Sequence, residues 1–125
     1  MVESKQVPLL LFALTVFVLA IANIFIWASY GHGELAIRTY TNWTARISFL
    51  VFIVAFTAST LAQLWPNAAT LWCLNNRRYW GLNFALAHAV HLGALTLYVV
   101  ISNTEPSMVT LVFGGLAYVF VALMA

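Results

Sequence analysis

The chain has 125 residues, of which 64% are hydrophobic and 6% are charged, and its formal net charge is +2. A soluble domain carries about 25% charged residues, so this composition excludes a soluble globule and indicates a membrane protein. The small net charge, with no basic cluster beyond one arginine pair, argues against nucleic acid as a partner. The single cysteine, Cys73, excludes an intrachain disulfide and a multi-cysteine metal site, and we expect it in a loop.

Four long apolar segments follow one another along the chain. Each approaches the ~20 residues that cross ~30 Å of hydrocarbon, and continuous apolar runs favour helices over barrel strands. The sequence therefore predicts an all-α fold, a polytopic transmembrane helical bundle embedded in the lipid bilayer. We expect a single transmembrane domain, residues 1–125, with spans at about 8–30, 44–64, 79–101 and 108–125.

The first span follows Lys5 and is too long for the core of a cleavable signal peptide, which is roughly 7–15 residues. We therefore interpret it as a retained helix. Every tryptophan falls at a predicted membrane interface, as an aromatic belt does. These residues are Trp27, Trp43, Trp65, Trp72 and Trp80.

The distribution of lysine and arginine predicts the orientation in the membrane. Lys5, Arg77 and Arg78 share one side, whereas Arg38 and Arg46 share the other. Because cytoplasmic loops carry the excess of positive residues, we expect the N-terminus in the cytoplasm.

Two histidines, His88 and His91, lie about 4.5 Å apart along the axis of the third predicted span. An ionisable side chain at bilayer depth is costly, so it is by default a functional-site hypothesis. A ridge of small residues lies beside them and allows another helix or a flat ligand to come close. The ridge consists of Ala85, Ala89 and Gly93. Alternatively, the histidines are structural and form hydrogen bonds between helices.

The residue types around this pair favour haem over other metal sites. No span contains Asp or Glu, which excludes a di-iron carboxylate site, and a zinc or copper ion would lack further ligands. Haem iron needs only axial imidazole and an apolar slot. Two side chains on one side of a helix cannot ligate both faces of a porphyrin, so the second ligand must come from another helix or a second copy.

Three arginines have two interpretations each. Arg77 and Arg78 are either positive-inside anchors or donors to haem propionates or a lipid phosphate. Arg46, at the head of the second predicted span, has the same two interpretations.

Two segments resemble a known family. Residues 77–82 read RRYWGL and are followed by an apolar run to His91, nine residues after the leucine; residues 42–50 read NWTARISFL. This order and spacing resemble ferric-reductase-like transmembrane domains. Within that family the chain is most similar to the haem-binding membrane subunits of periplasmic methionine sulfoxide reductase systems.

The resemblance implies a six-helix domain that passes electrons through haem b across the bacterial inner membrane. It implies His91 as the axial ligand of the haem iron and His88 as a second ligand or a hydrogen-bond partner. Arg46, Arg77 and Arg78 become candidate contacts on the propionate or quinone side. The electron donor would be a quinol or a flavin-bearing reductase, since this chain has no nucleotide-binding motif.

In that family the remaining ligating histidines lie on a later helix. The last apolar run here ends at Ala125 without a polar flank, so we expect the chain to stop before its natural boundary. Two other functions stay open. One is a non-enzymatic small membrane subunit whose histidines are structural. The other is a small transporter or channel component, which would lack both an intramembrane carboxylate and a broken helix.

Overall fold

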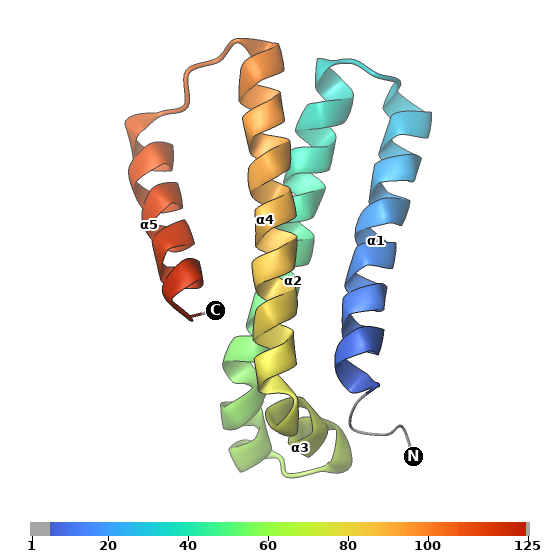
Figure 1. Ribbon diagram of the computed structural model, residues 1–125, viewed down its shortest axis with the longest axis vertical. Helices are drawn as coiled ribbons and strands as arrows, with labels where there is room; N and C mark the ends of the chain where they lie inside the picture. Colours follow the sequence, from blue (N-terminus) through green and yellow to red (C-terminus); the bar gives the residue numbers. More distant parts are fainter. Residues whose placement is uncertain (1–5, 125) are drawn as a thin grey trace.

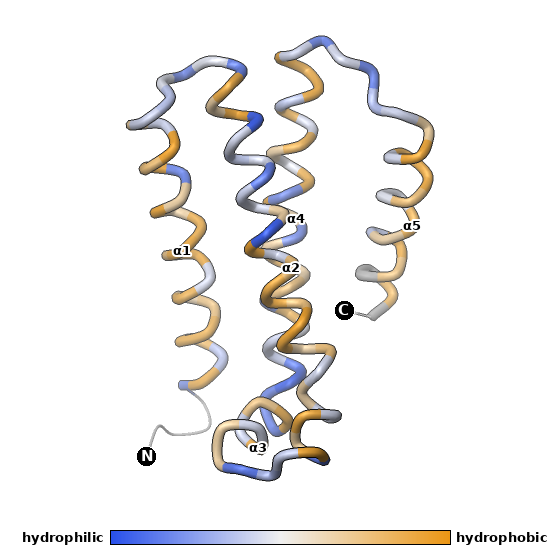
Figure 2. Tube along the Cα trace, turned by 180° about the vertical axis from the view of Figure 1, so that it is seen from behind, coloured by the Kyte–Doolittle hydropathy of each residue, from blue (hydrophilic) through white to orange (hydrophobic). Residues whose placement is uncertain are grey.

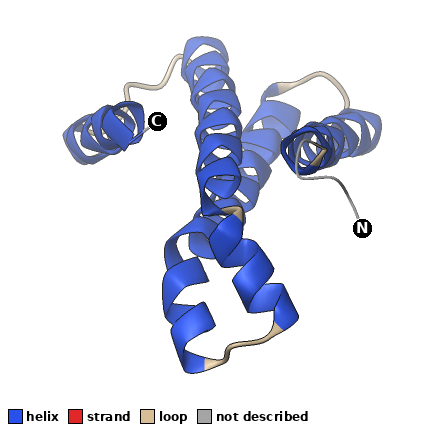
Figure 3. Ribbon diagram, turned by 60° about the horizontal axis from the view of Figure 1, so that its bottom comes forward, coloured by secondary structure: helices blue, strands red, loops and turns tan. Residues whose placement is uncertain are grey.

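The computed structural model describes residues 6–124, which form helices, turns and loops without any strand (Figure 3). Lys5 and Ala125, the end of the fourth predicted span, lie outside the described residues. The predicted all-α class is confirmed for the described part of the chain. Its elements are α1 (Val7–Tyr30), α2 (Glu34–Leu64), α3 (Ala68–Asn75), α4 (Arg77–Ser102) and α5 (Met108–Met124).

Three helices, α1, α2 and α4, are long and apolar enough to cross a membrane. At ~1.5 Å per residue they measure about 36, 46 and 39 Å, which exceeds ~30 Å of hydrocarbon. The fourth predicted span is not confirmed. Helix α5 has 17 residues, a length of about 26 Å. The fold is therefore compatible with a membrane protein of three spanning helices and a shorter apolar one.

Helix α2 begins ten residues before the predicted span, at Glu34 rather than Thr44. Gly33 precedes it in an extended conformation, and the Glu34 carboxylate suits the positive end of the helix dipole. These first ten residues of α2 include many polar side chains, so hydropathy alone does not identify them as part of the helix. Their inner face is nevertheless buried at helical spacing, at Ala36, Ile37 and Thr41.

Helix α3 replaces the loop predicted around Cys73. The side chain of Asn67 accepts hydrogen bonds from the backbone N–H groups of Ala69 and Thr70, at 2.9 and 3.0 Å. The hydroxyl of Thr70 in turn accepts from the N–H of Asn67, at 3.0 Å. This reciprocal capping box starts the helix. Helix α3 turns the chain back, so α4 runs antiparallel to α2 (Figure 1).

The most extensive helix contact joins α2 and α4. Figure 2 shows hydrophilic segments within this pair, whereas α1 and α5 are mostly hydrophobic along their length. Helix α1 also packs on α2 and α4, but α5 makes few contacts with the rest of the fold. Small side chains allow the two central helices to approach closely. The buried alanines of these two helices are Ala36, Ala58, Ala62, Ala87 and Ala94.

The small-residue ridge expected to admit a close neighbour is only partly covered: Ala85 is half-buried and lines a cavity with residues of α2. Ala89 and Gly93 are exposed, and a Cβ added at Gly93 would meet nothing within 4 Å. The buried alanines of α4 are instead Ala87 and Ala94, at 0% and 6% exposure.

Candidate functional site

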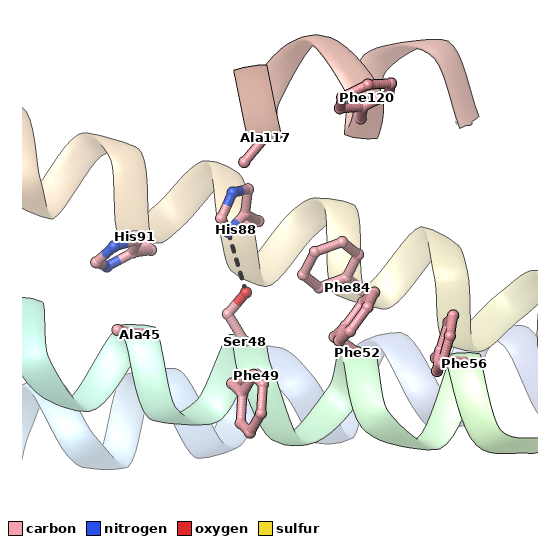
Figure 4. A pocket seen from close by; sticks show the side chains of 10 residues that line it. All are labelled: Ala45, Ser48, Phe49, Phe52, Phe56, Phe84, His88, His91, Ala117 and Phe120. Carbon is pink, nitrogen blue, oxygen red and sulfur yellow. Dashed lines mark hydrogen bonds between the residues drawn. The ribbon is translucent and has the colours of Figure 1, made fainter. Parts of the chain in front are cut away.

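The two histidines of α4 meet two hydroxyl groups of α2. Thr44 Oγ1 lies 3.1 Å from His91 Nδ1, and Ser48 Oγ lies 3.3 Å from His88 Nδ1. Figure 4 shows the second of these bonds. Thr44 and Ser48 are only 0% and 2% exposed, and the antiparallel helices place one hydroxyl opposite each imidazole. Each ring is therefore held by a hydrogen bond between its Nδ1 atom and a hydroxyl group of α2.

The hydroxyl of Thr44 has two hydrogen-bond partners, the backbone carbonyl of Thr41 and the imidazole of His91. It donates its one hydrogen to the backbone carbonyl of Thr41 at 2.9 Å. When both bonds form together, Thr44 accepts the hydrogen bond from His91, whose Nδ1 carries the hydrogen. The Nε2 of His91 then bears a lone pair, which is the form of neutral imidazole that ligates metals.

His88 is held between two helices. Its ring stacks on that of Tyr118 of α5, with 4.3 Å between centroids and 27° between planes. The hydroxyl of Tyr118 also donates to the backbone carbonyl of His88 at 2.9 Å. The Nε2 of His88 is buried and has no hydrogen-bond partner among the described residues. A buried polar atom without a partner costs about 1–3 kcal/mol, so this nitrogen needs one.

A cavity of about 520 Å³ opens beside the two imidazoles, between α2, α4 and α5. Its volume lies within the ~300–1,000 Å³ of small-molecule and cofactor sites. His88, His91 and Ser48 supply its polar atoms, and the rest of its wall is apolar (Figure 4). The apolar lining consists of Ala45, Phe49, Phe52, Phe56, Phe84, Ala117 and Phe120.

Two imidazoles of α4 are the candidate metal-ligating or cofactor-ligating groups of this cavity. The rings of His88 and His91 come from the same helix, with centroids 6.0 Å apart. No group of three His, Cys, Asp or Glu side chains within residues 6–124 is placed to hold a metal ion. On the α5 side the wall is apolar, with Ala117 and Phe120 (Figure 4). The described chain thus offers imidazole to one face of a flat ligand.

The three arginines do not join the histidines. Arg46 is exposed, with its guanidinium 5.5 Å from the ring centroid of Trp43, and both residues lie within α2 rather than at its start. Arg77 and Arg78 begin α4 and line a different cavity. The structure therefore brings His88 and His91 together and places Arg46, Arg77 and Arg78 outside their cavity.

Sequence reasoning missed the partners of the histidines, namely Thr44, Ser48 and Tyr118. A signal existed for the first two: Thr41, Thr44 and Ser48 recur at spacings of three and four, so they share one face of a helix. Tyr118 gave no signal, because its contact joins two helices whose packing no local pattern encodes.

The comparisons with known proteins give no relative. No protein-family model, no curated protein and no solved structure matches this chain. The family resemblance of the second and third predicted spans stays a prediction, and the function is argued from the site.

Proposed function

We propose that the chain holds a b-type haem in the histidine cavity and passes electrons across the membrane, as ferric-reductase-like domains do. His91 is the axial ligand of the haem iron in this proposal. One observation carries it: the Nδ1 of His91 lies 3.1 Å from the hydroxyl of Thr44, so Nε2 is the ring nitrogen left to ligate. The apolar wall of the cavity suits a macrocycle.

Each residue of the site has a separate task. Thr44 fixes the ring orientation of His91 and increases its basicity as a ligand, as second partners of ligating histidines do. The phenylalanines of the wall exclude water and keep the local dielectric low. His88, whose Nε2 has no partner among the described residues, serves as a hydrogen-bond partner beside the bound group. When bound, the haem supplies the one-electron chemistry.

The proposal requires partners beyond the described residues. The second axial ligand comes from another helix or a second copy of the chain, because both described imidazoles lie on α4. The electron donor is a quinol or a flavin-bearing reductase. The membrane is the bacterial inner membrane, with the N-terminus in the cytoplasm.

An optical spectrum of the purified protein tests this proposal. The chain is expressed with added haem, and we expect Soret and α bands of b type that disappear in His91→Ala. His32→Ala is the matched control and keeps both bands, because His32 lies in the turn between α1 and α2 against Trp27. A colourless wild-type protein, or a His91→Ala protein with unchanged bands, would contradict haem ligation by His91.

A non-enzymatic membrane subunit is the second candidate function. The bonds of both Nδ1 atoms to hydroxyl groups of α2 favour it, because they join the two central helices directly. In this case the protein stays colourless with added haem. His91→Ala then lowers only the stability of the α2–α4 pair.

A further inference from the structure

A second cavity of about 520 Å³ lies between α2 and α4, toward the end of the fold that contains α3. Arg77, Arg78 and Ser59 line it, together with aromatic and small side chains. It shares three residues with the histidine cavity but contains neither histidine. The shared residues are Phe52, Phe56 and Phe84.

The charge of this cavity is positive and is not balanced by the described chain. Arginine stays protonated in proteins, so Arg77 and Arg78 bring two positive charges. The described carboxylates, Glu34 and Glu105, lie at the other end of the long helices, one at the start of α2 and one after α4.

The surroundings place this positive cavity at a membrane interface. Arg77 and Arg78 begin a helix that is long and apolar enough to span. Trp72 and Trp80 pack edge to face beside them, with 6.3 Å between ring centroids, and tryptophan prefers the headgroup level of a bilayer. The cavity therefore combines a charged mouth with an apolar wall that continues toward the bilayer interior.

We propose that this cavity binds the phosphate of an anionic phospholipid. The guanidinium groups of Arg77 and Arg78 form charge-assisted bonds to the phosphate oxygens, and the acyl chains lie against Phe56 and Leu82. Basic pockets between membrane helices bind anionic headgroups in this way. A zwitterionic lipid fits poorly, because the cavity contains no carboxylate for its ammonium group. The proposal does not depend on haem binding.

Position in the fold separates this pair from an ordinary membrane anchor. Arg38 is also an exposed arginine on a spanning helix, but it is not among the residues that line this cavity. If Arg77 and Arg78 only anchor the helix, all three arginines should contribute alike to lipid binding. If they form a site, only the pair should matter.

Lipid titration of the delipidated full chain in neutral detergent tests the proposal. Dioleoyl phosphatidylglycerol is added, and bound lipid is counted by native mass spectrometry. We expect saturable binding that weakens about tenfold or more in the Arg77→Gln, Arg78→Gln double variant, in line with the strength of charge-assisted hydrogen bonds. Arg38→Gln is the matched control and binds within twofold of the wild type.

Two further ligands identify what the cavity recognises. Dioleoyl phosphatidylcholine carries the same chains and should bind at least tenfold more weakly. Inorganic phosphate should compete only at much higher concentration; competition as strong as that of the lipid would mean a free-anion site and would overturn the proposal. Equal binding of both lipids, or unchanged binding by the double variant, would overturn it as well. The Arg77→Lys, Arg78→Lys variant keeps the charge if the glutamine variant fails to fold, and should lose part of the affinity.

Discussion

A single hydroxyl group, that of Thr44, lies within hydrogen-bond distance of His91 Nδ1, at 3.1 Å. Thr44→Val keeps the shape of the side chain but removes the acceptor for the Nδ1 hydrogen of His91. Since partners of this kind are worth about 10–100-fold in metal affinity, we expect haem to bind that much more weakly. Haem titration of the apoprotein, followed by absorbance, measures the effect.

Two variants control for the loss of a hydroxyl. Thr44→Ser retains the acceptor and should bind haem nearly as tightly as the wild type. Thr15→Val removes a buried hydroxyl that bonds only to the carbonyl of Leu11 in its own helix, so affinity should not change. If Thr44→Val binds haem as tightly as the wild type, the role assigned to Thr44 is wrong.

The sequence identified the histidines but not their partners. A lone imidazole in an apolar span is conspicuous, because burying an ionisable group in lipid is costly. A hydroxyl group is not conspicuous in such a span. Thr and Ser in helices commonly donate to a backbone carbonyl one turn back, as Thr57 does here at 2.7 Å. Only the register of α2 against α4 distinguishes Thr44 and Ser48 from such residues.

At the scale of the helices, hydropathy predicted the long apolar helices. It located α1 and α4 to within two residues at each end. It missed the first ten residues of α2 and all of α3, because those segments are specified by caps and by a buried stripe among polar residues. The spacing of small residues indicated room for another helix or a flat ligand at Ala85, Ala89 and Gly93. Ala89 and Gly93 are exposed, and the buried alanines of α4 are Ala87 and Ala94.

The α2–α4 contact depends on small side chains, and Ala87 is its most buried member on α4, at 0% exposure. Ala87→Leu should force the helices apart and lower the free energy of unfolding by about 1–3 kcal/mol. Ala89→Leu is the matched control on the same helix, since Ala89 is exposed, and should have little effect. Unfolding in detergent, followed by circular dichroism, gives both values. Equal stability of the two variants would place the contact elsewhere.

At the scale of the whole molecule, the topology assigns each turn to one side of the membrane. Cys73, the single cysteine, lies in α3 at the end of the fold where α1 starts (Figure 1). Because the lysine and arginine count favours a cytoplasmic N-terminus, Cys73 should resist a membrane-impermeant maleimide in intact cells. It should react once the cells are permeabilised.

A second cysteine position makes this topology test reciprocal. Ser107→Cys in a Cys73→Ser background introduces a thiol in the exposed connection between α4 and α5, at the opposite end. It should react in intact cells. The reverse pattern at both positions would invert the orientation, and identical labelling of both would contradict the arrangement of α2, α3 and α4.

The sparse contact of α5 with the other helices has a consequence for the order of events during synthesis. Chains are made from the N-terminus, so α1, α2 and α4 leave the ribosome before α5 does. Until then the face that carries His88 lacks the cover of Tyr118, Ala117 and Phe120. The widest access to the histidines therefore comes while the chain is still being translated, before α5 is in place.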